Sequence, residues 1–164
     1  MTSEFIVHVD EHDFEYAVLN YSQNVPVVVD FWATWCKPCL TLSPMLERLT
    51  VEAGGALRLA KVNVDDAPNL ALRFGVRSIP AVKAFTNGQV VAEFSGLQPE
   101  PRLREFFSGI VPPSPLTLAL EKANGLLSQQ LWKASENLFR QILDQDMALP
   151  AALLGLLKAL IPQG

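Results

Sequence analysis

Hydrophobic and polar positions along residues 5–110 predict a series of short strands and helices. Apolar runs rich in branched and aromatic residues predict strands at 5–9, 25–32, 57–64, 81–86 and 89–95. Apolar positions at helical spacing, with start and stop signals, predict helices at 10–21, 36–53, 66–74 and 99–110. This order predicts an α/β fold in which helices cover both faces of a mixed sheet and the strand 25–32 is buried at its centre.

After residue 111 the pattern changes to helices alone. The segment 112–115 reads Pro-Pro-Ser-Pro, which cannot continue a helix and predicts a stiff linker. The segment 116–164 then shows two amphipathic stripes and a stretch, 148–161, that is apolar nearly all round. We therefore expect a first domain at 1–111, the linker, and a small all-α tail that is truncated if further repeats follow it.

The composition is that of a folded globular protein. Of 164 residues, 49% are hydrophobic and 18% charged, and the net charge of −4 argues against a nucleic-acid partner. The longest apolar run, 151–161, is interrupted by Lys158 and is too short to span a bilayer. No basic segment followed by an apolar one opens the chain, so we expect a cytoplasmic protein without a membrane partner.

Both cysteines lie in Cys36-Lys37-Pro38-Cys39, directly after the buried strand. Pro38 suits the first turn of a helix, which places Cys36 at a strand-to-helix junction. Unpaired N–H groups and the helix dipole favour a thiolate there, so its pKa should lie below the roughly 8.5 of a free cysteine. The alternatives are half of a zinc site or two inert core thiols. His8 and His12 lack the spacing of zinc ligands, and no metal is expected.

The residues around the cysteines resemble the thioredoxin family over about 5–110. The family signature D-F-W-x-x-W-C-G-P-C is matched by Asp30, Trp32, Trp35, Cys36, Pro38 and Cys39. Further matches follow in the family's order at Lys61, Pro80 and Asn87-Gly88. The resemblance implies a thioredoxin fold and thiol–disulfide exchange. Cys36 then attacks a substrate disulfide, Cys39 resolves the mixed disulfide, and no bound cofactor is needed.

Asp30 is a candidate proton acceptor because it lies within an apolar strand. Desolvation there should raise its pKa toward neutrality. The alternative is a buried aspartate satisfied by hydrogen bonds alone. The resemblance favours the functional interpretation, because the matching aspartate of thioredoxins assists deprotonation of the second cysteine with a lysine nearby, here Lys61.

The resemblance also implies a docking surface for substrates. Thioredoxins hold the bond before the matching proline cis and facing the cysteines, so the backbone of Ile79 would pair with an extended substrate segment. The predicted docking residues are Trp35, Lys37, Pro38, Ile79, Pro80 and Gly96. Lys37 departs from the family, which usually has glycine there. Its ammonium favours the Cys36 thiolate slightly, or it is an exposed lysine without effect.

Two functions follow as hypotheses. The first is a protein-disulfide reductase that acts on protein disulfides and is recharged by a partner of the thioredoxin reductase type. The second is a chaperone or adaptor whose tail binds unfolded or partner proteins. Trp132, Ala134 and Leu138, followed by the loop 144–150, resemble a degenerate tetratricopeptide repeat. Because the stretch 148–161 has no polar face, self-association through it is a further expectation.

Overall fold

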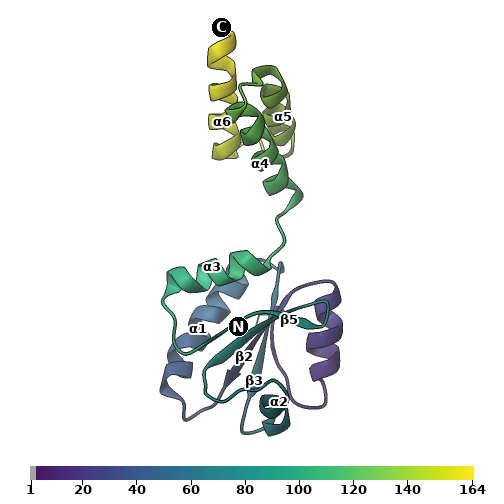
Figure 1. Ribbon diagram of the computed structural model, residues 1–164, viewed down its shortest axis with the longest axis vertical. Helices are drawn as coiled ribbons and strands as arrows, with labels where there is room; N and C mark the ends of the chain where they lie inside the picture. Colours follow the sequence, from purple (N-terminus) through teal and green to yellow (C-terminus); the bar gives the residue numbers. More distant parts are fainter. Residues whose placement is uncertain (1–2) are drawn as a thin grey trace. The chain divides into compact units, whose positions relative to one another are not determined.

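A computed structural model describes residues 3–164. The chain forms two compact units, the first ending at Pro112 and the second beginning at Pro113. Figure 1 shows an α/β unit that contains the sheet and a unit made only of helices. No helix among residues 3–164 is long and apolar enough to cross a membrane.

The first unit is built on a five-stranded sheet with the order β1-β3-β2-β4-β5. The strands are β1 (Ile6–His8), β2 (Val27–Trp32), β3 (Arg58–Asn63), β4 (Ala81–Thr86) and β5 (Gln89–Ser95). The strands β1, β3 and β2 are parallel, whereas β4 and β5 run antiparallel to their neighbours. The predicted mixed sheet with a central strand is confirmed. The turn at Asn87-Gly88 has positive φ at both residues, as an Asn-Gly hairpin requires.

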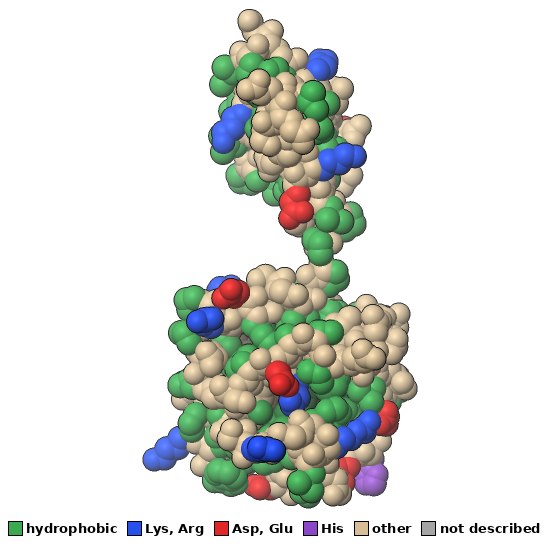
Figure 2. Space-filling model, viewed as in Figure 1, with side chains coloured by type: hydrophobic (Ala, Val, Ile, Leu, Met, Phe, Trp, Pro, Cys, Tyr) green, Lys and Arg blue, Asp and Glu red, His purple; other side chains and the backbone are tan. Residues whose placement is uncertain are grey.

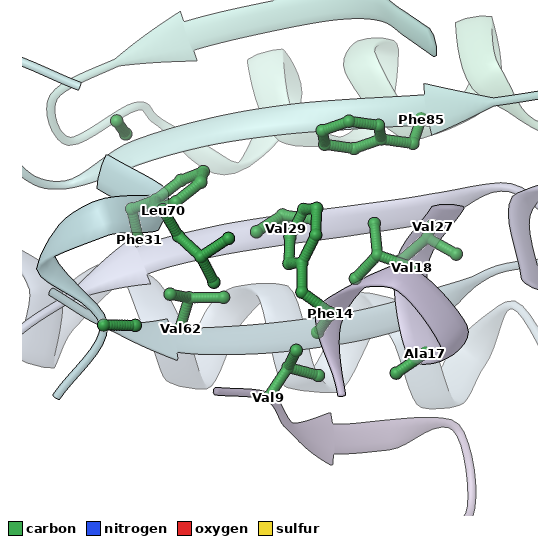
Figure 3. Packing of buried hydrophobic residues seen from close by; sticks show 13 residues of the cluster. Val9, Phe14, Ala17, Val18, Val27, Val29, Phe31, Val62, Leu70 and Phe85 are labelled. Carbon is green, nitrogen blue, oxygen red and sulfur yellow. The ribbon is translucent and has the colours of Figure 1, made fainter. Parts of the chain in front are cut away.

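Helices cover both faces of this sheet. The elements are the π-helix η1 (Glu15–Asn20), the 3-10 turn η2 (Tyr21–Gln23), α1 (Lys37–Glu52), α2 (Pro68–Arg73) and α3 (Glu100–Ile110). Because side chains alternate along a strand, β2 sends Val27, Val29 and Phe31 to one face and Val28 to the other. The first three pack under η1 and α2, as Figure 3 shows, and Val28 packs against α1 and α3.

Two predicted helices are shorter than their sequence pattern suggested. The helix expected at 10–21 begins only after Asp13. Before it, the Asp10 carboxylate accepts hydrogen bonds from the N–H groups of His12 and Asp13 and stabilises a turn. The helix expected at 66–74 begins at Pro68, since Ala67 before it has non-helical backbone angles, with φ −130° and ψ 60°. Neither change alters the layers around the sheet.

The second unit contains α4 (Pro115–Ser128), α5 (Trp132–Gln145), α6 (Pro150–Leu160) and a final 3-10 turn, η3 (Ile161–Gln163). The helix α4 begins one residue before its predicted start, because the Ser114 hydroxyl caps the Thr117 N–H at 3.1 Å and Pro115 suits the first helical position. The core of this unit contains Ala123, Phe139, Ile142 and Ala152. Three helices packed on one small core therefore follow the sheet, as predicted.

Candidate active site

Cys36 and Cys39 form a disulfide at the start of α1, with their Cα atoms 5.3 Å apart. Cys36 caps the helix, and its Sγ accepts the backbone N–H of Cys39 at 3.2 Å. Its exposed fraction is 4%, against 0% for Cys39. When the disulfide is reduced, the helix N-terminus and this N–H favour a thiolate on Cys36, the thiol closer to solvent.

Asp30 lies on β2 and is fully buried. Its Oδ2 accepts a hydrogen bond from the Ser43 hydroxyl of α1, whereas Oδ1 has no hydrogen-bond partner among the described residues. Burial raises the pKa of Asp30 to about 6, although the Ser43 hydrogen bond and the charge of Lys61 both lower it. The direction of this shift is the one expected from desolvation within an apolar strand.

Lys61 lies beside Asp30 in the sheet but forms its ion pair with another residue. It is in register with Asp30 on the neighbouring strand β3. Its Nζ is 2.7 Å from Glu47 Oε1 on α1 and 5.0 Å from the centre of the Trp32 ring. The positive charge of Lys61 lowers the pKa of Asp30, and the negative charge of Glu47 raises it. Asp30 and this ion pair therefore form one electrostatic group.

Of the predicted docking residues, Ile79 lies next to the disulfide, and Pro80 and Gly96 are hydrogen-bonded to each other. Ile79 packs against the cluster of Ala33, Cys36 and Cys39. The Ile79–Pro80 bond is cis, as the resemblance implied. The Gly96 N–H donates to the Pro80 carbonyl at 2.8 Å, and its φ of 82° favours glycine.

Trp35, Lys37 and Pro38 are exposed around the disulfide. Trp35 has an exposed fraction of 67%, and its indole N–H donates to Asp65 Oδ2 at 2.9 Å. A groove beside it is lined by Val76, Arg77 and Ile79, among others. Trp35 is therefore a surface residue held in place by a hydrogen bond, not a core packing residue.

A metal site finds no support in the described residues. Among residues 3–164 no group of three or more His, Cys, Asp and Glu side chains could hold a metal ion. His8 is on β1 and His12 in the turn after it, whereas both cysteines are bonded to each other. The cysteine pair is present here as a disulfide.

A disulfide at the start of a helix that packs on a mixed sheet, in the strand order observed here, defines a thiol–disulfide oxidoreductase of the thioredoxin fold. The model of the family "Thioredoxin" matches residues 5–108, and the chain belongs to the thioredoxin family. The helical unit lies outside that match.

Curated relatives match the same part of the chain. A thioredoxin of Haemophilus influenzae is 41% identical over 103 residues, which is 63% of this chain and 94% of the relative. Thioredoxin C-2 of Corynebacterium nephridii is 38% identical over 104 residues, with the same coverage. The mitochondrial thioredoxin of Bos taurus is 41% identical over 102 residues, 62% of this chain and 60% of the relative.

Sequence reasoning missed three polar partners in the site: Ser43, Glu47 and Asp65. A signal existed for the first two. Cys39, Ser43 and Glu47 follow one another at intervals of four residues, which places them on one face of α1. No comparable spacing links Asp65 to Trp35, because their contact joins the loop after β2 to the loop after β3.

Proposed function

We propose that the protein is a protein-disulfide reductase in which Cys36 is the nucleophile. The observation that supports this most is the position of Cys36 at the N-terminus of α1, with the Cys39 N–H on its sulfur. The Cys36 thiolate attacks one sulfur of a substrate disulfide, and the other substrate sulfur leaves as a thiolate. The Cys39 thiolate then attacks Cys36, the Cys36–Cys39 bond forms, and the second substrate thiolate leaves. Two electrons have passed to the substrate.

In this mechanism Asp30 accepts the Cys39 proton before the second attack. Its free Oδ1 and its raised pKa of about 6 suit a group that takes a proton at neutral pH and returns it. Lys61 acts through its charge, which favours the ionised carboxyl. No bound cofactor is required for these steps.

The proposed docking surface consists of Trp35, Lys37, Pro38, Ile79, Pro80 and Gly96. It fits an extended segment of a protein substrate, whose backbone would pair at Ile79 while the exposed Trp35 ring supplies apolar contact. The oxidised protein would be returned to the dithiol by a reductase of the thioredoxin reductase type. We propose a cytoplasmic location, where thiols are kept reduced.

The reduction potential of the Cys36–Cys39 pair tests the direction of the reaction. We expect a value close to the about −270 mV typical of thioredoxin, since Lys37 is exposed and adds little to the stability of the thiolate. Equilibration in glutathione buffers, followed by trapping of free thiols, gives this value. A potential near about −120 mV is typical of an oxidase and would contradict a reductase.

We also propose a binding role for the helical unit, as a chaperone or adaptor. The helix α6 buries its small residues Ala152, Gly155 and Ala159. Exposed on the rest of α6 and in η3 are Leu153, Leu154, Leu157 and Ile161. Figure 2 shows hydrophobic side chains on the surface of this unit. Exposed apolar side chains gathered on one helix favour an interaction surface for unfolded or partner proteins, or for a second copy.

We expect the chain to self-associate at tens of micromolar through 148–161. Changing both Leu154 and Leu157 to lysine should restore a monomer, because both are exposed and the change leaves the core intact. Leu118→Lys, at an equally exposed leucine of α4, is the matched control and should not restore it. Sedimentation decides this. A monomeric unmodified chain that binds no hydrophobic dye would remove both the self-association and the chaperone proposals.

A further inference from the structure

Ser43 is a buried polar residue of α1 that the mechanism above does not use. It is 6% exposed, and its hydroxyl donates to Asp30 Oδ2 across the gap between α1 and β2. Thr50 in the same helix is also buried, but its hydroxyl donates to the Leu46 carbonyl of its own helix at 2.7 Å. Helical hydroxyls commonly take that local route. The Ser43 hydroxyl instead binds the one buried carboxyl of β2.

The two carboxyl oxygens of Asp30 have different surroundings. The hydroxyl of Ser43 occupies Oδ2, and Oδ1 has no hydrogen-bond partner among the described residues. Ser43 lies four residues after Cys39, so both side chains belong to the same face of α1. The helix thus presents a hydroxyl donor and the resolving thiol to the same strand.

We propose that Ser43 is a positioning residue of the exchange reaction: its hydroxyl holds one carboxyl oxygen of Asp30 so that the other remains free to take the Cys39 proton. The inference rests on the proton-accepting role of Asp30 proposed above. A donor on Oδ2 stabilises the carboxylate more than the protonated acid, which has less negative charge to accept the bond. Ser43 therefore keeps Asp30 ionised at a pH where burial alone would protonate it.

The other charged groups that act on Asp30 do not supply a hydrogen bond to it. Lys61 on β3 and Glu47 on α1 pair with each other, and their charges shift the Asp30 pKa in opposite directions. On the other side of β2, the residue of β4 in register with Asp30 is Val82, which carries no titratable group. Ser43 is thus the one side-chain hydrogen-bond donor to Asp30 among the described residues.

The test compares Ser43→Ala with Ser43→Thr in the full chain. Loss of the hydroxyl in Ser43→Ala is expected to raise the pKa of Asp30 by about one pH unit. NMR of the Asp30 carboxyl carbon measures this pKa. The pH midpoint of single-turnover disulfide reduction should move upward by the same amount. Ser43→Thr retains the hydroxyl and should leave both near the wild-type values. Thr50→Val removes a hydroxyl of the same helix that does not touch Asp30, and should also leave both unchanged.

Asp30→Asn separates this inference from the proposal on which it rests. If that change leaves the pH midpoint in place, Asp30 is not the proton acceptor and both ideas fail. If it removes the midpoint while Ser43→Ala moves neither the midpoint nor the Asp30 titration, the Ser43 inference alone is wrong. When Ser43→Ala is added to Asp30→Asn, it is expected to have no further effect on the pH profile.

A measurement on the unmodified protein covers the case in which Ser43→Ala fails to fold. The buried Ser43 hydroxyl proton is expected to exchange slowly and to shift downfield as Asp30 ionises, because its acceptor becomes charged. If the chemical shift of the Ser43 hydroxyl proton does not change as Asp30 titrates, the proposal is wrong.

Discussion

Replacing Cys36 by serine is expected to lower the rate of protein-disulfide reduction by at least about a thousandfold, because a hydroxyl at this position supplies no thiolate. Replacing Cys39 by serine should also stop turnover, but at a later step. The Cys36 thiolate still attacks the substrate, and nothing resolves the product. Cys39→Ser is therefore expected to accumulate mixed disulfides with protein substrates, visible as bands that a reductant removes.

Each serine variant is a matched control for the other, because each removes one thiol and both lose the Cys36–Cys39 bond. Only their place in the site differs. Cys36 caps α1 and is the more exposed sulfur, whereas Cys39 is fully buried in the first turn. If mixed disulfides accumulate on Cys36→Ser and not on Cys39→Ser, Cys39 is the nucleophile and Cys36 the resolving thiol, which contradicts the proposal.

Asp30→Asn is expected to change how stability depends on pH. The pKa of Asp30 is about 6 in the folded protein, above the ordinary value of about 4 for an unfolded chain. Between these values the folded state holds a proton that the unfolded state has released, so the free energy of unfolding falls as the pH rises. Above about pH 7 the penalty is complete, and it amounts to about 3 kcal/mol.

The asparagine variant has no such titration. Its free energy of unfolding relative to wild type should therefore rise by about 2.5 kcal/mol from pH 4 to pH 8, because at pH 4 part of the unfolded chains still hold the proton. Urea unfolding of the oxidised proteins at both pH values measures this. Asp66→Asn, at an exposed carboxyl of the same unit, is the matched control and should follow the wild type. Equal pH dependence in the wild type and Asp30→Asn would show that Asp30 does not titrate in this range.

The central part of the site could be predicted from sequence because its signals are local. A run of branched residues that ends in two cysteines and a proline specifies β2, the junction and the start of α1 within one stretch of chain. The cis bond at Pro80 and the place of Gly96 came only from the family resemblance, because composition carries no sign of either.

The partners that tune the site were harder to predict because they come from different elements. Glu47, and not Asp30, pairs with Lys61, and this choice depends on how α1 packs over β2 and β3. Ser43 reads in the sequence as a small residue between Leu42 and Pro44. Its partner became visible only when the helix was placed on the strand.

In the helical unit, more of the structure could be predicted from the sequence than in the site. Its three helices were predictable from periodicity alone, and the apolar character of 148–161 appears directly in the sequence. The structure adds which side of α6 is buried, because Gly155 allows close approach to the Phe139 ring.

The order in which the two thiols of the reduced protein react with iodoacetamide tests the central claim most directly. The helix N-terminus and the greater exposure both favour reaction at Cys36. Peptide mapping after brief labelling at about pH 6 to 7 is expected to find the label on Cys36 well before Cys39. Equal labelling of the two cysteines, or earlier labelling of Cys39, would contradict Cys36 as the nucleophile.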